Sequence, residues 1–169
     1  MTLVPREPES ASGPSPVRRS AANPSGRLRA LAHFRILRLI GLGGMSEVYL
    51  AYDPKSRRQV AIKVLANHLV TNQCFVNRFL QEGRLGRDLT HPNIVKAYFY
   101  GQDPVSKKYF IVMEFVDGPT AQDRLEKEGR LPLVDATRII VDIARGLEFL
   151  HHRHYVHRDI KPGNILIAP

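Results

Sequence analysis

Apolar and β-branched residues recur in short runs through the first two thirds of the chain, and this pattern predicts a sheet. The runs cover residues 34–40, 48–51, 59–65, 94–100 and 109–116. Residues 72–89 interrupt them with apolar side chains at helical spacing, and a stronger helical pattern covers 133–151. We therefore expect five strands with one helix among them, followed by helices, an order typical of an α+β fold.

Chain breakers divide the sequence into three parts. Residues 1–32 are rich in Pro, Ser, Ala and Arg, which predicts a disordered tail. Asp117-Gly118-Pro119 predicts a linker between two lobes, followed by a short polar helix ending near Glu128. We therefore expect a first lobe at 33–117 and the start of a second lobe at 118–169.

A glycine-rich segment, Gly41-Leu42-Gly43-Gly44-Met45-Ser46, joins the first two predicted strands. Glycines let backbone N–H groups approach phosphate oxygens without obstruction by a Cβ atom. An ordinary glycine-rich turn is the alternative. Because a strand rather than a helix follows, the dinucleotide-binding fingerprint and the P-loop are both disfavoured.

Two charged residues lie in otherwise apolar surroundings. Lys63 is on the third predicted strand, and a lysine reaching out to water is one reading of it. Glu82 falls on the core-facing stripe of helix 72–89, where an unpaired carboxylate would cost several kcal/mol. Lys63 is the obvious cation to pair with it. Gly83 and Gly86 weaken the same helix, which suggests a mobile element.

The segment His157-Arg158-Asp159-Ile160-Lys161-Pro162-Gly163-Asn164 concentrates the most reactive chemistry of the chain. A carboxylate, an ammonium group and an amide lie within eight residues. Phosphoryl transfer can use such a set as a base, a phosphate clamp and a metal ligand.

The order of these parts resembles the protein kinase family, most closely the eukaryotic-like serine/threonine kinases of bacteria. The resemblance covers about 34–167 and rests on the glycine segment, Val60-Ala61-Ile62-Lys63, Glu82, His91-Pro92-Asn93-Ile94-Val95, Val112-Met113-Glu114-Phe115-Val116 and the segment 157–166. It implies a kinase N-lobe, made of a five-stranded antiparallel sheet and one helix, followed by the first helices and the catalytic loop of the C-lobe.

The resemblance also implies roles for individual residues. An ATP site would be formed by Ile40, Gly41, Leu42, Gly43, Gly44, Met45, Ser46, Val48, Ala61, Lys63, Met113, Glu114 and Val116. Lys63, held by Glu82, would contact the α- and β-phosphates, and the backbone of Glu114 and Val116 would bind the adenine base.

In the catalytic loop, the resemblance makes Asp159 the residue that orients the substrate hydroxyl and accepts its proton. Lys161 would stabilise the γ-phosphoryl group and Asn164 would hold Mg2+. Arg158 resembles the regulatory arginine that pairs with a phosphorylated activation loop. ATP and Mg2+ are thus the expected cofactors, and a protein with a Ser or Thr hydroxyl is the expected substrate.

Two departures from the family pattern concern Ser46 and the end of the chain. Ser46 replaces the third loop glycine, which we expect to leave ATP binding intact. The sequence reaches Ala168-Pro169 without an Asp-Phe-Gly motif, which would supply a second Mg2+ ligand. We therefore expect a truncated kinase, inactive as this chain. A non-catalytic nucleotide-binding or protein-interaction module is the alternative.

Composition adds constraints on partners and compartment. The formal net charge of +9 suits an anionic partner but does not identify one. We expect no nucleic-acid partner, because no aromatic residues accompany the arginines of the tail. The single cysteine, Cys74, and the absence of a long apolar stretch favour the cytoplasm. We expect Cys74 to be at least half-buried near the start of its helix.

Overall fold

The computed structural model describes residues 2–3 and 28–168. These residues form two compact units, one of 28–87 and 97–115, the other of 2–3, 88–96 and 116–168. Most of the tail predicted over 1–32 lies outside the described residues.

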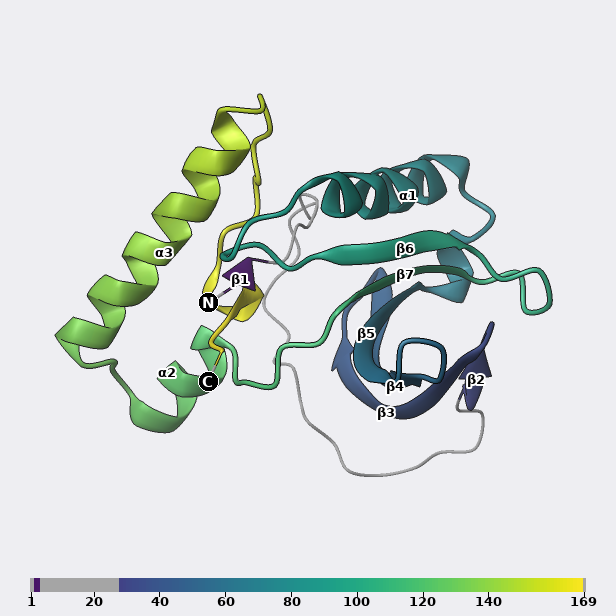
Figure 1. Ribbon diagram of the computed structural model, residues 1–169, viewed down its shortest axis with the longest axis horizontal. Coiled ribbons are helices and arrows are strands. Elements are labelled where there is room, and N and C mark those ends of the chain that lie inside the picture. The colour runs from purple at the N-terminus through teal and green to yellow at the C-terminus, as the bar shows by residue number, and fades with distance from the viewer. Residues whose placement is uncertain (1, 4–27, 169) are drawn as a thin grey trace. The chain divides into compact units, whose positions relative to one another are not determined.

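An antiparallel sheet of six strands is the main element of the first unit among the described residues (Figure 1). In spatial order the strands are β2 (Ala30–Leu31), β3 (Phe34–Leu42), β4 (Ser46–Asp53), β5 (Arg58–Leu65), β7 (Tyr109–Glu114) and β6 (Ala97–Gln102). The five predicted strands are present, and the short strand β2 adds a sixth. Leu31 of β2 is only 1% exposed and packs in the same core as Phe34, so the ordered sheet begins before residue 33.

Strand β5 is buried on both faces. Val60, Ile62 and Val64 alternate along it and enter the core of the curled sheet. That core also contains Leu31, Phe34, Tyr49, Ala51, Phe110 and Val112. The opposite face of β5 includes Lys63, which is 5% exposed. A short 3-10 helix, η1 (Asn67–Leu69), follows β5.

Helix α1 (Gln73–Asp88) lies along β6 and is the helix predicted over 72–89 (Figure 1). The Asn72 side chain accepts a hydrogen bond from the Cys74 N–H, 3.0 Å long, and thus caps the helix start. Cys74 itself is exposed, so the expectation that it is at least half-buried was wrong. It lies in the first turn, where its side chain is directed away from the core stripe.

Close packing explains the two glycines of α1. A Cβ atom on Gly83 would lie 2.5 Å from Tyr100 Cβ, and one on Gly86 would lie 3.0 Å from Ala97 Cβ. Both partners belong to β6, so the glycines allow helix and strand to approach each other closely. They therefore hold α1 against the sheet, which differs from the mobile element that their low helix propensity suggested.

The β4–β5 and β6–β7 turns share the sequence pattern Asp-Pro-x-Ser. In the first turn, Asp53 accepts a 2.6 Å hydrogen bond from the Ser56 hydroxyl. In the second, Asp103 accepts hydrogen bonds from the hydroxyl and the backbone N–H of Ser106, at 2.6 and 2.7 Å. The Ser106 hydroxyl is the largest of the influences that hold the pKa of Asp103 below its usual value of 3.8.

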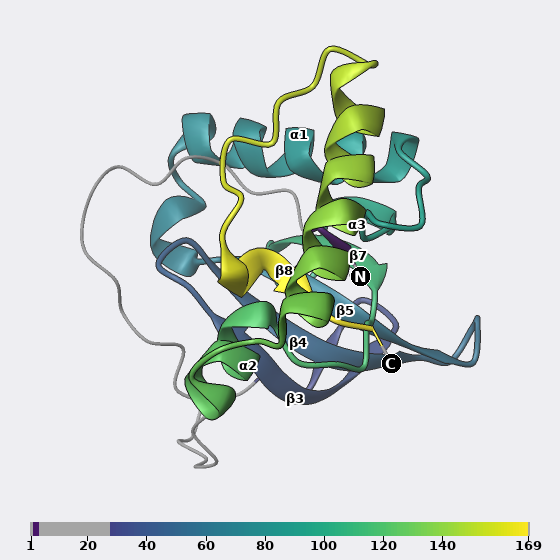
Figure 2. The same cartoon turned by 90° about the vertical axis from the view of Figure 1, so that its left-hand side faces the viewer.

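The second unit contains α2 (Ala121–Glu128), α3 (Leu133–His151), the 3-10 helix η2 (Pro162–Asn164) and the strand pair β8 (Ile165–Leu166) and β1 (Thr2–Leu3). Figure 2 shows β8 beside α2. The bounds of α3 are those predicted from its periodicity. Ile139, Ile143 and Leu147 of α3 pack on a small core made by Ala121 and Ile165.

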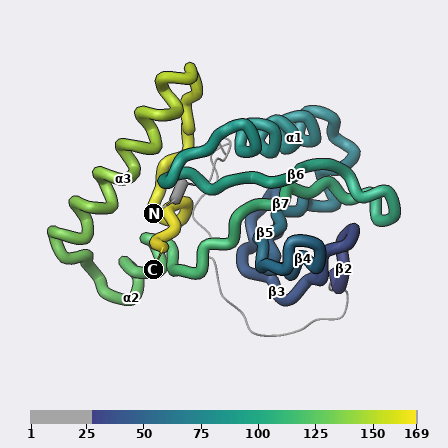
Figure 3. Tube along the Cα trace, in the orientation of Figure 1, coloured from purple at the N-terminus to yellow at the C-terminus, as the bar shows by residue number. Residues whose placement is uncertain are grey.

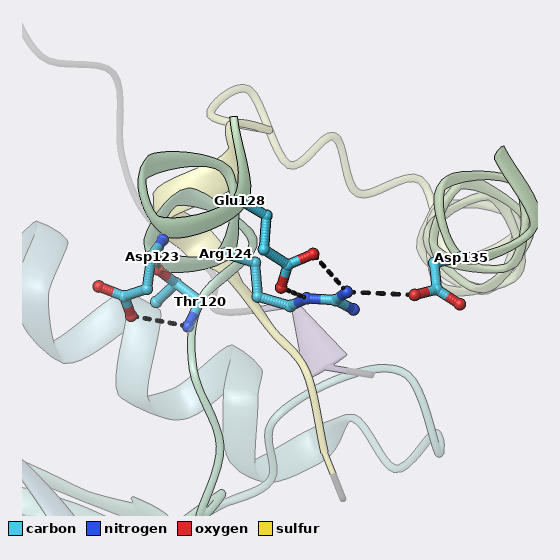
Figure 4. Close-up of polar contacts among 5 residues, drawn as sticks. All are labelled: Thr120, Asp123, Arg124, Glu128 and Asp135. Carbon is cyan, nitrogen blue, oxygen red and sulfur yellow. Dashed lines mark hydrogen bonds and ion pairs between the residues drawn. The ribbon is translucent and has the colours of Figure 1, made fainter. Parts of the chain in front are cut away.

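Helix α2 is fixed at both ends by polar contacts (Figure 4). Thr120 and Asp123 form a capping box, in which each side chain accepts a hydrogen bond from the other residue's backbone N–H. Arg124 donates to Glu128 at 2.8 and 2.9 Å and to Asp135 of α3 at 3.1 Å. The Glu128 hydrogen bond is the main cause of a raised pKa of the Arg124 guanidinium.

The segment 88–96 belongs to the second unit and packs on α3. Leu89 and Ile94 form a core with Leu150, and the His91 ring lies 4.8 Å from that of Phe149. The strand predicted over 94–100 begins only at Ala97. The preceding residues instead form a turn in which His91 Nδ1 accepts a 3.1 Å hydrogen bond from Asn93 N–H.

Candidate functional site

The glycine segment forms the tip of the β3–β4 hairpin. Strand β3 extends to Leu42 and β4 starts at Ser46, so Gly41 is paired with Val48 and only residues 43–45 form the turn. Gly43 N–H closes the turn with a 2.9 Å hydrogen bond to Ser46 O. No heavy atom lies within 4 Å of the position that a Cβ on Gly44 would occupy. Packing therefore does not require a glycine at position 44.

The register of the sheet brings other predicted ATP-site residues next to this hairpin. Val48 is paired with Lys63, and Ala61 is paired with Met113 on β7. Ala61, Lys63 and Met113 are all buried. Val48, Ala61, Lys63 and Met113 are thus adjacent on strands β4, β5 and β7. Val116 follows β7 and belongs to the second unit. Ile40 lies on β3 directly before Gly41.

Lys63 and Glu82 form a buried ion pair within the first unit. Lys63 Nζ is 2.6 Å from both carboxylate oxygens of Glu82, and the two side chains are 6% and 12% exposed. The reading of Lys63 as a solvent-exposed lysine is therefore excluded. Replacing such a buried pair by apolar residues is often neutral or stabilising. Its presence is better explained by a positioned ammonium group than by a need for stability.

The second cluster of reactive groups lies in the loop between α3 and β8. Asn164 Nδ2 donates hydrogen bonds to the backbone oxygen of Asp159 at 2.9 Å and to its Oδ2 at 2.8 Å. Lys161 Nζ lies 3.3 Å from Asp159 Oδ1. Asn164 is 4% exposed, whereas the Asp159 side chain is 17% exposed. The carboxylate is therefore held from two sides and remains accessible.

His157 supports Asp159 from the buried side. It is 7% exposed, and its Nδ1 accepts a 3.4 Å hydrogen bond from the Asp159 N–H. Arg158 between them is exposed and has a φ of 63°, in the left-handed region. No role was expected for His157 from the sequence. Its position two residues before Asp159 was the signal that could have indicated a supporting role.

The donor set of this loop fits a hard divalent cation. The Asn164 amide nitrogen is directed at Asp159, so the amide oxygen is the atom that this side chain would offer to a cation. Carbonyl and carboxylate oxygens are the ligands that Mg2+ prefers. Lys161 adds a positive charge that can approach an anionic phosphoryl group.

A curled antiparallel sheet with a buried Lys–Glu pair, together with a loop that carries Asp, Lys and Asn, defines a protein kinase fold. Residues 34–169 match the protein kinase domain family, and the chain belongs to this family. The structural comparison agrees, since the kinase domain of Mycobacterium tuberculosis PknI superposes with a TM-score of 0.72 at 29% identity. That match covers 87% of this chain and 58% of the PknI chain.

Curated relatives are bacterial serine/threonine-protein kinases. PknA of Corynebacterium glutamicum is 45% identical over 140 residues, which is 81% of this chain and 30% of PknA. PrkC of Bacillus subtilis is 41% identical over 139 residues, which is 82% of this chain and 21% of PrkC. The chain thus spans a third or less of the length of these relatives.

None of the helices within residues 28–168 has both the length and the apolar character needed to cross a membrane.

Proposed function

We propose that the protein transfers the γ-phosphoryl group of ATP to Ser or Thr hydroxyls of other proteins, with Mg2+ as the metal. The 169-residue chain would supply the nucleotide-binding strands and the catalytic loop for this reaction. Its support is membership of the kinase family and the serine/threonine-protein kinases among its relatives. Asp159-Ile160-Lys161-Pro162 also follows the serine/threonine form of the catalytic loop.

The cluster of Asp159, Lys161 and Asn164 is the observation that carries the proposal. Asn164 and Lys161 hold the Asp159 carboxylate in one orientation, in which it can accept a proton from a substrate hydroxyl. Mg2+ bound by Asn164 would neutralise charge on the phosphates. A base that is already oriented does not have to be ordered during the reaction, which lowers the activation free energy.

In the first unit, Lys63 would bind the α- and β-phosphates. Glu82 holds the ammonium group through both oxygens and leaves its remaining N–H donor for a phosphate. Gly41, Gly43 and Gly44 would bring backbone N–H groups close to the same phosphates. The backbone of Glu114 and Val116 would bind the adenine base, with Ile40, Val48, Ala61 and Met113 providing apolar contacts.

Titration with ADP and Mg2+ tests the nucleotide part of the proposal. Wild-type chain should bind ADP, and Lys63→Met should weaken binding by about tenfold or more, because a charge-assisted contact to phosphate is lost. Arg84→Met is a matched control, since Arg84 lies exposed on α1. Equal ADP affinities of wild type and Lys63→Met would refute the assignment.

A non-catalytic module that binds a partner protein is the competing function. The exposed apolar side chains of α3, Leu133, Val134 and Ile140, are the observation in its favour. Such a module requires no ADP binding that depends on Lys63, so the same titration separates the two functions.

A further inference from the structure

The linker that follows Val116 runs directly against the chain that follows the catalytic loop. Thr120 forms an antiparallel bridge with Leu166, and Ile167 N–H donates a 2.9 Å hydrogen bond to Pro119 O. Figure 3 shows these two stretches, the turn into α2 and the C-terminal end of the trace, next to each other. Residues far apart in sequence are thus joined by backbone contacts within one unit.

Gly118 lies at the tightest point of this contact. A Cβ atom placed on Gly118 would be 1.9 Å from the backbone oxygen of Ile167 and 3.0 Å from its carbonyl carbon. Ordinary C···O contacts are no shorter than about 3.3 Å, so a methyl group here would displace one of the two backbones by about 1.4 Å. The obstructing atom is backbone, which cannot turn away as a flexible side chain could.

The contact continues in both directions to residues of the proposed site. Gly118 N–H donates a 3.0 Å hydrogen bond to Val116 O, which forms a three-residue turn around Asp117. On the other side of the contact, Ile167 comes directly after β8, and β8 comes directly after Asn164. Beyond Thr120, the capping box holds the start of α2 in place.

We infer that Gly118 is a positioning residue for nucleotide binding: its missing side chain lets the linker pack on residues 166–167 and so fixes the Val116 backbone relative to Asn164. The inference rests on the proposed function, in which Val116 contacts the base and Asn164 holds Mg2+. Gly118 itself touches neither group. It sets the distance between the backbone of Val116, which would bind the adenine base, and Asn164, which would bind the metal.

Gly118→Ala tests this positioning role through the affinity for ADP in the presence of Mg2+. A displaced Val116 backbone would lose its hydrogen bond to the base, so we expect ADP affinity to fall by about tenfold. Inorganic pyrophosphate, which has no base, should compete equally well in both proteins. Pro119→Ala is the matched control, because it keeps the carbonyl that accepts from Ile167, and it should bind ADP as wild type does.

Each outcome decides the matter. Unchanged ADP affinity in Gly118→Ala overturns the positioning role while leaving the proposed function intact, whereas a wild-type chain that binds no ADP removes both. If Gly118→Ala does not fold, the hydrogen-exchange rate of the Ile167 amide in the wild-type chain tests the positioning role instead. Slower exchange when ADP is added supports the coupling, and an unchanged rate contradicts it.

Discussion

Replacing Gly83 by alanine should destabilise the first unit although alanine is the better helix former. The new Cβ would lie 2.5 Å from Tyr100 Cβ, 2.9 Å from Tyr100 Cγ and 3.1 Å from Ile111 Cγ1. Optimal carbon–carbon separations are about 3.5–4.0 Å, so α1 must move away from β6 by about 1 Å. Overpacking of this kind costs about 1–3 kcal/mol, and the gain in helix propensity returns about 1 kcal/mol.

We expect a net loss of about 1–2 kcal/mol for Gly83→Ala, because the obstructing atoms lie at the base of Tyr100, where side-chain rotation gives no relief. The chain has no tryptophan, so urea unfolding should be followed by far-UV circular dichroism. Glu82 precedes Gly83 and should move with the helix. Its 2.6 Å contacts with Lys63 would then lengthen, and ADP binding should weaken in parallel.

Gly86→Ala provides the matched comparison within the same helix. Its new Cβ would meet Ala97 Cβ at 3.0 Å and no other side-chain atom within 4 Å, so overpacking and helix propensity should nearly cancel. Wild type and Gly86→Ala should have similar stabilities, and Gly83→Ala should be less stable than both. A Gly83→Ala variant as stable as wild type would show that α1 does not depend on this close approach.

Three further variants test other local features. His154 follows the end of α3 and has a φ of 62°, so His154→Gly should raise stability by about 1 kcal/mol. The turn there is closed by hydrogen bonds from His154 N–H to His151 O, 2.9 Å long, and from Tyr155 N–H to Leu150 O, 3.0 Å long. A lower thermal midpoint than wild type contradicts this, and the control His151→Gly, at the last residue of α3 and without a positive φ, should not raise the midpoint. Asp103→Asn should cost about 1–2 kcal/mol near neutral pH through weaker hydrogen bonds to Ser106. Because the pKa of Asp103 is lower in the folded chain than its usual 3.8, this stabilisation is present above pH 3.8 and is lost as the pH falls through the folded value. Denaturation at a series of pH values should show the gap between wild type and Asp103→Asn closing in acid, and a gap that stays constant would rule out the linkage. Asn164→Ala should abolish the strengthening of ADP binding by Mg2+, measured by titration with and without the metal; retained Mg2+ dependence would remove Asn164 from the metal site.

Local sequence patterns were sufficient to predict the order of the helices and strands and the residues that carry reactive groups. Periodicity alone predicted α3 with its observed bounds. The unfavourable burial of Glu82 predicted a cationic partner, and the structure contains the Lys63–Glu82 pair. These inferences worked because helix and strand periods, and the cost of burying a charge, depend on few neighbouring residues.

Only the tertiary structure decided the features that depend on contacts between distant segments. From the sequence, Gly83 was a residue of low helix propensity and Gly118 was a chain breaker. In the structure, close contacts with Tyr100 and Ile167 explain why neither position has room for a side chain. Leu31 was assigned to the tail because no local pattern shows that it completes the core beside Phe34. Cys74 was expected to be at least half-buried, but the rotation of α1 about its axis leaves it exposed. A one-dimensional pattern records which residues are apolar or small, but the atom that will lie opposite each of them is set by the packing of elements distant in sequence.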